Sequence, residues 1–135
     1  MHDPSVLVVY RAQASGRRAL AAAAALDVPL TVVALAPKQL RSACCGIYTP
    51  ALDLAVHAAA EQELDTAREL LGERARAAEF VVVETKRDQD LARWAVGAGF
   101  TTALIGARRT LLGVGPRDLA ARALSRAGLE VRSIE

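Results

Sequence analysis

The segment from Thr101 to Asp118 reads Thr-Thr-Ala-Leu-Ile-Gly-Ala-Arg-Arg-Thr-Leu-Leu-Gly-Val-Gly-Pro-Arg-Asp. Its apolar beginning predicts a buried strand over Thr102–Ile105 that ends at Gly106. A helix is predicted from about Arg117 to Ala127. In an α/β sheet, ligands bind where the carboxyl end of a strand faces the amino end of a helix. This junction is therefore the first candidate for a binding site.

The rest of the chain alternates apolar runs with segments of helical periodicity. The apolar runs predict four further strands: Ser5–Tyr10, Leu30–Leu35, Glu79–Glu84 and Leu129–Ile134. The periodic segments predict three further helices: Gly16–Leu26 with Ser15 as its N-cap, Pro50 to about Ala77, and a shorter one that Asp88 or Asp90 caps and that Gly97 and Gly99 end. Gly128 is expected to be the C′ residue of the last helix.

The long predicted helix has one apolar stripe, in which residues recur at three- and four-residue spacing. The stripe contains Val56, Ala60, Leu64, Ala67, Leu71 and Ala75. The opposite face contains Glu61, Asp65, Arg68, Glu69 and Arg76. This helix is therefore expected to lie on the surface of a sheet with its stripe buried.

Strands that alternate with helices pair in parallel through right-handed crossovers. The order of elements predicts an α/β fold: a three-layer, doubly wound sandwich with a five-stranded, mainly parallel sheet. The first four strands are nearly all apolar, which is typical of central or well-covered strands. The fifth alternates charged and apolar residues, which favours an edge or interface strand. Residues 1–135 are expected to form a single domain.

The composition and charge of the chain argue against several classes of function. A net charge of +2 with scattered arginines does not favour nucleic-acid binding. The longest apolar window, Ala19–Leu26, is far shorter than the roughly 18 residues of a membrane span. The amino terminus has no basic segment followed by an apolar one, so no signal peptide is predicted. We expect a cytoplasmic protein without a membrane or nucleic-acid partner.

Cys44 and Cys45 are adjacent and lie in the long connection from Lys38 to Thr49. Their Cα atoms are about 3.8 Å apart, whereas ordinary disulfides need roughly 4.4–6.8 Å. Both are therefore expected to be thiols, and a redox-sensing role for the pair stays open.

The order of elements, the helix ending Ala67-Arg-Glu-Leu-Leu71, and the tail containing Ala123-Leu-Ser-Arg-Ala-Gly-Leu-Glu-Val131 resemble the universal stress protein family. The resemblance covers nearly the whole chain as a pattern of elements. It implies a five-stranded parallel α/β sandwich that is usually dimeric through its last strand. In the ATP-binding branch, an aspartate follows the first strand and a glycine-spaced phosphate loop follows the fourth.

The chain departs from the ATP-binding pattern at its key positions. Arg11 stands where the resemblance places the aspartate, and Arg109 stands where it places the second glycine after Gly106. Gly113 and Gly115 offer glycines on a shortened loop, but neither precedes Ser or Thr. The resemblance therefore implies that ATP does not bind in the usual mode of the family.

A small anion remains a candidate ligand, with ATP or AMP as alternatives. Guanidinium groups and loop N–H groups can hold a phosphate or carboxylate. The candidates are Arg11, Gly106, Arg108, Arg109, Gly113, Gly115 and Arg117. The competing interpretation is that these arginines form a solvated rim over the end of the sheet.

No catalytic residue and no metal site are predicted. His57 is the only internal histidine, and mid-helix it is expected to be a partly exposed surface residue. No other metal-binding side chain stands at zinc-ligand spacing from it. Two functions remain: a non-catalytic dimer that binds a partner or a small ligand other than ATP, and a nucleotide-binding protein that uses the altered loop.

Overall fold

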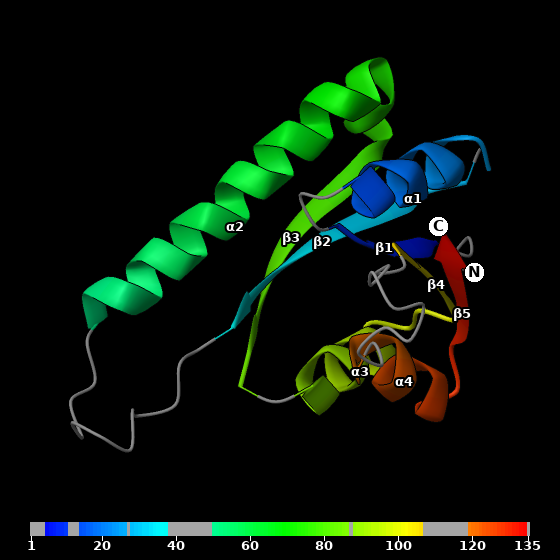
Figure 1. The fold of residues 1–135 in the computed structure, drawn as a ribbon. Helices are drawn as coiled ribbons and strands as arrows, with labels where there is room; N and C mark the ends of the chain where they lie inside the picture. Colours follow the sequence, from blue (N-terminus) through cyan, green and yellow to red (C-terminus); the bar gives the residue numbers. More distant parts are fainter. Residues whose placement is uncertain are drawn as a thin grey trace, which may run out of the picture.

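The computed structural model describes residues 5–10, 14–26, 28–37, 50–86, 88–106 and 119–134. Its five strands form one sheet in the order β3-β2-β1-β4-β5, and every neighbouring pair is parallel (Figure 1). The strands are β1 (Val6–Val9), β2 (Leu30–Pro37), β3 (Ala78–Thr85), β4 (Thr102–Gly106) and β5 (Glu130–Ile134). The predicted five-stranded sheet is confirmed, and it is parallel throughout.

Four α-helices cover the two faces of the sheet (Figure 1). They are α1 (Ala14–Ala24), α2 (Pro50–Leu71), α3 (Asp88–Gly97) and α4 (Leu119–Arg126). The first two pack on one face and the last two on the other, as the two apolar clusters show. This arrangement is the predicted three-layer α/β sandwich. Within the described residues, no helix has both the length and the hydropathy to cross a membrane.

Strand β1 lies at the centre of the sheet. Val6 pairs with Leu30 of β2 on one side and with Thr102 of β4 on the other. All four of its residues are buried, and Leu7, Val8 and Val9 are 0% exposed. Because side chains alternate along a strand, Val8 packs under α1 and α2, whereas Leu7 and Val9 pack under α3 and α4.

The apolar stripe of α2 confirms the sequence prediction. Ala60, Leu64, Ala67 and Leu71 are buried against the sheet, and Val56 is partly buried beside them. Glu61, Asp65, Arg68, Glu69 and Arg76 are all exposed, as predicted. The alanines matter because they let the helix backbone approach the strands closely.

Two predicted helix boundaries are wrong. Helix α1 begins at Ala14, so Ser15 lies inside the helix and is not its N-cap. Helix α2 ends at Leu71 rather than near Ala77, and a 3-10 helix, η1 (Gly72–Ala77), follows it. Gly72 has a φ of 59°, a left-handed conformation that glycine adopts without steric cost. The helical periodicity continued past this glycine, so the pattern alone did not reveal the change.

Helices α3 and α4 end in the same capping motif. After α4, the Leu129 N–H donates to the Leu124 carbonyl and the Gly128 N–H to the Ser125 carbonyl. Gly128 has a φ of 99°, which confirms it as the C′ residue. Gly99 has the same role after α3, with a φ of 87°. These caps turn the chain sharply from each helix toward the next strand, β4 or β5.

The start of α3 is fixed by a side chain. The Asp90 carboxylate accepts a hydrogen bond from the Lys86 N–H at 2.7 Å. Asp90 is the third residue of α3 and reaches back over the first turn. The sequence predicted that Asp88 or Asp90 caps this helix, and this hydrogen bond is made by Asp90.

Candidate functional site

The strand order changes direction between β1 and β4: the strand that follows β1 in the sequence lies on one side of the pair, and the strand that follows β4 lies on the other. From β1 the chain crosses by α1 to β2, and from β4 it crosses by α4 to β5, on the other face of the sheet. The two connections therefore lead from neighbouring strands to opposite faces and toward opposite edges of the sheet. In open α/β sheets, such a switch point is where ligands bind. We call the carboxyl ends of β1 and β4, at Tyr10 and Gly106, the switch point.

Gly106 is the one predicted site residue that the structure describes. It is the last residue of β4, is buried, and pairs with Ile134 of β5. Val9 pairs with Ile105, so the residues that follow them, Tyr10 and Gly106, stand at the same level of the sheet. Gly106 is therefore at the strand end where the sequence placed it.

The other predicted residues lie outside the described residues. They are Arg11, Arg108, Arg109, Gly113, Gly115 and Arg117, together with the redox candidates Cys44 and Cys45. Arg11 follows Tyr10 directly, and Arg108 comes two residues after Gly106. In the sequence, both arginines thus come directly after or close after the strands whose ends form the switch point.

Tyr10 is a functional candidate that the sequence analysis treated only as the end of a strand. Its side chain is 1% exposed and belongs to the cluster under α1 and α2. Its backbone N–H donates to the Val33 carbonyl at 2.9 Å. Its buried hydroxyl has no hydrogen-bond partner among the described residues. The available signal was the sequence itself: a phenol ends a strand that is otherwise aliphatic.

An unpaired buried hydroxyl costs about 1–3 kcal/mol. This cost falls on the residue beside Gly106 at the switch point. A ligand with a hydrogen-bonding group, or a water molecule, would remove it. The Tyr10 hydroxyl is therefore a core polar group without a described partner, on the residue that stands at the end of β1.

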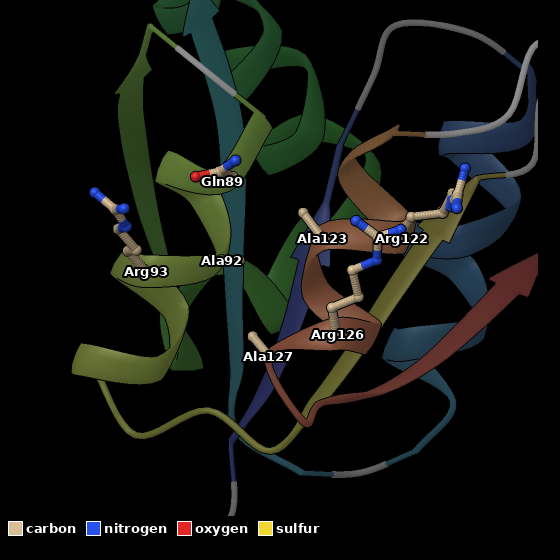
Figure 2. Close-up of a pocket in the computed structure, with 7 residues that line it drawn as sticks. All are labelled: Gln89, Ala92, Arg93, Arg122, Ala123, Arg126 and Ala127. Carbon is tan, nitrogen blue, oxygen red and sulfur yellow. The ribbon is translucent and has the colours of Figure 1, made fainter.

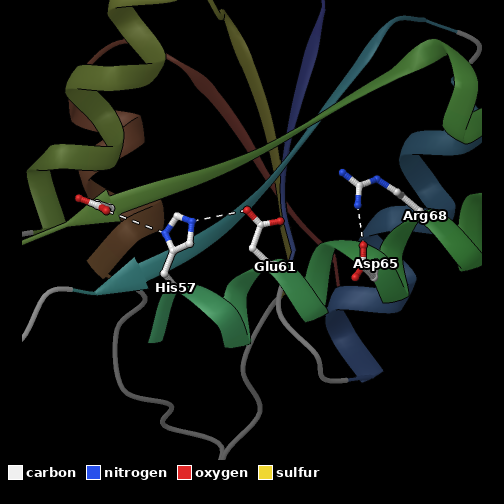
Figure 3. Close-up of polar contacts among 5 residues, drawn as sticks. His57, Glu61, Asp65 and Arg68 are labelled. Atoms are coloured by element: carbon white, nitrogen blue, oxygen red, sulfur yellow. Dashed lines mark hydrogen bonds and ion pairs between the residues drawn. The ribbon is translucent and has the colours of Figure 1, made fainter. Parts of the chain in front are cut away.

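His57 of α2 lies between two carboxylates (Figure 3). Its Nε2 is 3.5 Å from Glu61 Oε1, and its Nδ1 is 3.9 Å from Glu84 Oε1 on β3. The His57 side chain is 44% exposed, which confirms the predicted partly exposed histidine. The contact with β3 could not be predicted, because Glu84 is remote in sequence. Exposed pairs of this kind contribute little to stability.

A second contact joins α2 to β3. The Arg68 guanidinium binds the Asp65 carboxylate at 2.6 Å (Figure 3) and lies 4.6 Å from the centre of the Phe80 ring. Close by on the same helix, burial raises the pKa of Glu63 above its ordinary value. Of these contacts, Arg68 with Phe80 joins α2 to β3, and none involves β1 or β4, the two strands of the switch point. Among the described residues, no three metal-binding side chains gather into a site.

The Tyr10 hydroxyl gives the first prediction. We expect Tyr10→Phe to raise the free energy of unfolding of the ligand-free protein by about 1 kcal/mol, because the change removes an unpaired buried polar group. Urea denaturation measures this difference. A loss of stability of similar size would show instead that the hydroxyl has a partner in the free protein.

Comparison with known proteins gives matches for the structure but not for the sequence. No family model matches this sequence, and no curated protein matches it. Solved structures do match. A protein of the universal stress protein family from Burkholderia pseudomallei is 22% identical with a TM-score of 0.69, over 96% of this chain and 94% of that one.

Two further solved structures agree. A universal stress protein from Archaeoglobus fulgidus is 22% identical with a TM-score of 0.64, over 100% of this chain and 95% of that one. A universal stress protein solved in complex with cAMP is 19% identical with a TM-score of 0.57, over 100% and 99%. At these identities the similarity establishes the fold. The chain has the universal stress protein fold that the sequence resemblance implied.

Proposed function

We propose that this chain, which has the fold of the universal stress proteins, is a divergent member of that family that acts in stress response or regulation without catalysis. It works as a homodimer and binds a small anionic ligand at the switch point, but not ATP in the usual mode of the family. The observation that carries the proposal is the pairing of β1 with β4. This pairing sets Tyr10 beside Gly106, and in the sequence Arg11 follows the first and Arg108 follows the second within two residues.

The exclusion of ATP rests on the chemistry of two positions. A guanidinium at Arg11 has no acceptor atom, so it cannot take a hydrogen bond from a ribose hydroxyl or bind a metal ion as an aspartate would. Arg109 stands where the loop of the family has a glycine. A backbone that approaches phosphate closely often needs φ > 0, which arginine tolerates poorly.

The same residues favour a smaller anion. Guanidinium groups form paired hydrogen bonds with carboxylates and phosphates. Arg11, Arg108 and Arg109 supply three such groups within a few residues of the switch point. The buried Tyr10 hydroxyl adds a neutral group that can donate or accept a hydrogen bond.

The alternative is a nucleotide ligand held by the altered loop, and one observation favours it. A solved protein of this fold was crystallised with cAMP. A cyclic or single phosphate carries less charge than a triphosphate, and it requires fewer backbone N–H groups. In this case Arg108 and Arg109 would contact the phosphate.

The dimer is proposed through β5. Among the described strands it pairs only with β4, and it stands at the end of the sheet. Its exposed residues include Glu130 and Arg132, whose side chains pair at 3.2 Å. An open edge strand offers a row of backbone groups to a second chain. Two copies of β5 can therefore extend the sheet across the dimer.

The ligand prediction is tested by mass spectrometry of small molecules released from freshly purified protein, with calorimetric titrations of ATP, AMP and cAMP. We expect a released carboxylate or phosphate compound and no ATP binding at micromolar levels. The double variant Arg108→Ala/Arg109→Ala should lose the ligand. The control Arg76→Ala, an exposed arginine of η1, should keep it.

Each other outcome has a clear meaning. Co-purified ATP, or micromolar ATP binding by the unmodified chain, would contradict the exclusion of ATP. AMP or cAMP binding that the double variant abolishes would establish the alternative. A protein that releases nothing would contradict the ligand-binding part of the proposal.

The dimer prediction is tested by light scattering on a dilution series. We expect a particle of twice the chain mass at micromolar concentration, because β5 stands at the end of the sheet. A monomer across the whole series would contradict the dimer and leave the ligand proposal intact.

A further inference from the structure

A groove lies between α3 and α4, on the face of the sheet opposite α1 and α2 (Figure 2). Its volume is about 420 Å³. Its floor is made of three alanines: Ala92 from α3, and Ala123 and Ala127 from α4. We call it the α3–α4 groove. Gln89 of α3 also lines the groove. Because the alanine methyl groups are small, another backbone can approach closely over them.

Three arginines flank this floor. Figure 2 shows Arg93 on the outer side of α3, with Arg122 and Arg126 on α4 and the Arg126 side chain directed toward Arg122. All three are exposed. No carboxylate in the described part of the chain forms an ion pair with any of them. The groove therefore has an apolar centre and a positive margin on each side.

The acid Asp90 of α3 lies at the start of that helix, where its carboxylate accepts the Lys86 N–H. Val96 of α3, one turn beyond Ala92, is 51% exposed and extends the apolar surface. Elsewhere, on α2, the arginine Arg68 is paired with Asp65. What matters for binding is that three arginines without a described carboxylate partner line a single groove.

The groove is too open for a small molecule. Sites for small ligands bury most of the ligand surface. Of the residues that line this groove, Ala92 is buried and Ala123 is partly buried, whereas Arg93, Arg122 and Arg126 are exposed. A small anion would also reach only one margin, because Arg93 and Arg122 point to opposite sides.

We propose that the α3–α4 groove docks an acidic amphipathic helix of a partner protein. The apolar stripe of that helix lies on Ala92, Ala123 and Ala127. Its carboxylates, on both sides of the stripe, pair with Arg93 across one margin and with Arg122 and Arg126 across the other. This is the helix-in-groove mode of recognition, with the arginines supplying orientation.

The alanine floor and the arginine margins contribute differently to the binding free energy. Exposed ion pairs are worth at most about 1 kcal/mol each, so most of the affinity comes from apolar surface. Charge complementarity accelerates association and fixes the direction of the bound helix. Arginine suits this position because its long stem covers apolar surface while its planar group binds carboxylates. The site lies apart from the switch point and does not depend on the ligand proposed there.

The test uses a fluorescein-labelled synthetic peptide, with leucines along one helical face and glutamates on both flanks. Fluorescence anisotropy measures its binding to the full chain. We expect binding that weakens with salt, and a loss of at least about tenfold in Arg122→Glu/Arg126→Glu and in Arg93→Glu. The control Arg76→Glu makes the same charge change on η1 and should alter binding by less than about twofold.

Two further measurements separate the groove from general charge. A scrambled peptide of identical composition should bind at least about tenfold more weakly, because its leucines no longer form a stripe. A photoreactive group on the leucine stripe should cross-link to α3 and α4. Thermal melts confirm that each variant is folded.

Any of three results would overturn the proposal: the peptide does not bind, the scrambled peptide binds equally well, or Arg76→Glu weakens binding as much as the groove variants do. Full competition by inorganic phosphate at millimolar levels would show a site for small anions instead. A change in oligomeric state of the groove variants would show that a second copy of this chain occupies the groove.

Discussion

The structure depends on the burial of β1. Val6–Val9 pairs with β2 on one side and β4 on the other, all four residues are buried, and Leu7, Val8 and Val9 are 0% exposed. Full burial of a Val or Leu side chain contributes about 1.5–3 kcal/mol, and β1 has four such residues in a row. Both helical layers pack on this strand, since one half of its side chains lies under α1 and α2 and the other half under α3 and α4. The same strand places the switch point, because its carboxyl end stands beside that of β4.

Much of the fold could be predicted because buried positions show as a periodic pattern of apolar residues in the sequence. The strands that are apolar on both faces and the stripe on α2 were found from this pattern. The helix ends were less accessible: Gly72 ends α2 through a left-handed φ, and neighbouring residues still follow the helical period. The order of the strands could not be read either, because pairing such as Val9 with Ile105 joins segments that are remote in sequence.

The candidate site shows a similar division. Gly106 was placed correctly, since a glycine after an apolar strand marks a strand end. Tyr10 was missed as a polar group, because a strand pattern counts a tyrosine as apolar and gives no account of its hydroxyl. The α3–α4 groove was missed because it needs alanines and arginines from two helices that only the sheet brings together. Its arginines are ordinary surface residues when each helix is viewed alone.

The two surfaces suggest a division of roles between the switch point and the helical face. The fold is shared with universal stress proteins that are only 22% identical. The buried strands can persist through such divergence, because many apolar sequences satisfy them. Residues at the strand ends and on helix surfaces are free of that requirement. In the proposed function, Arg11 and Arg109 are changes of this kind that alter the binding chemistry.

The most direct test of this account is residue-resolved amide hydrogen exchange of the intact chain, followed by nuclear magnetic resonance. If β1 is the centre of the fold, the amides of Leu7, Val8 and Val9 should be among the last to exchange, with those of the edge strand β3 exchanging earlier. Exchange of the β1 amides as early as those of β3 would contradict the central place of β1, and with it the switch point.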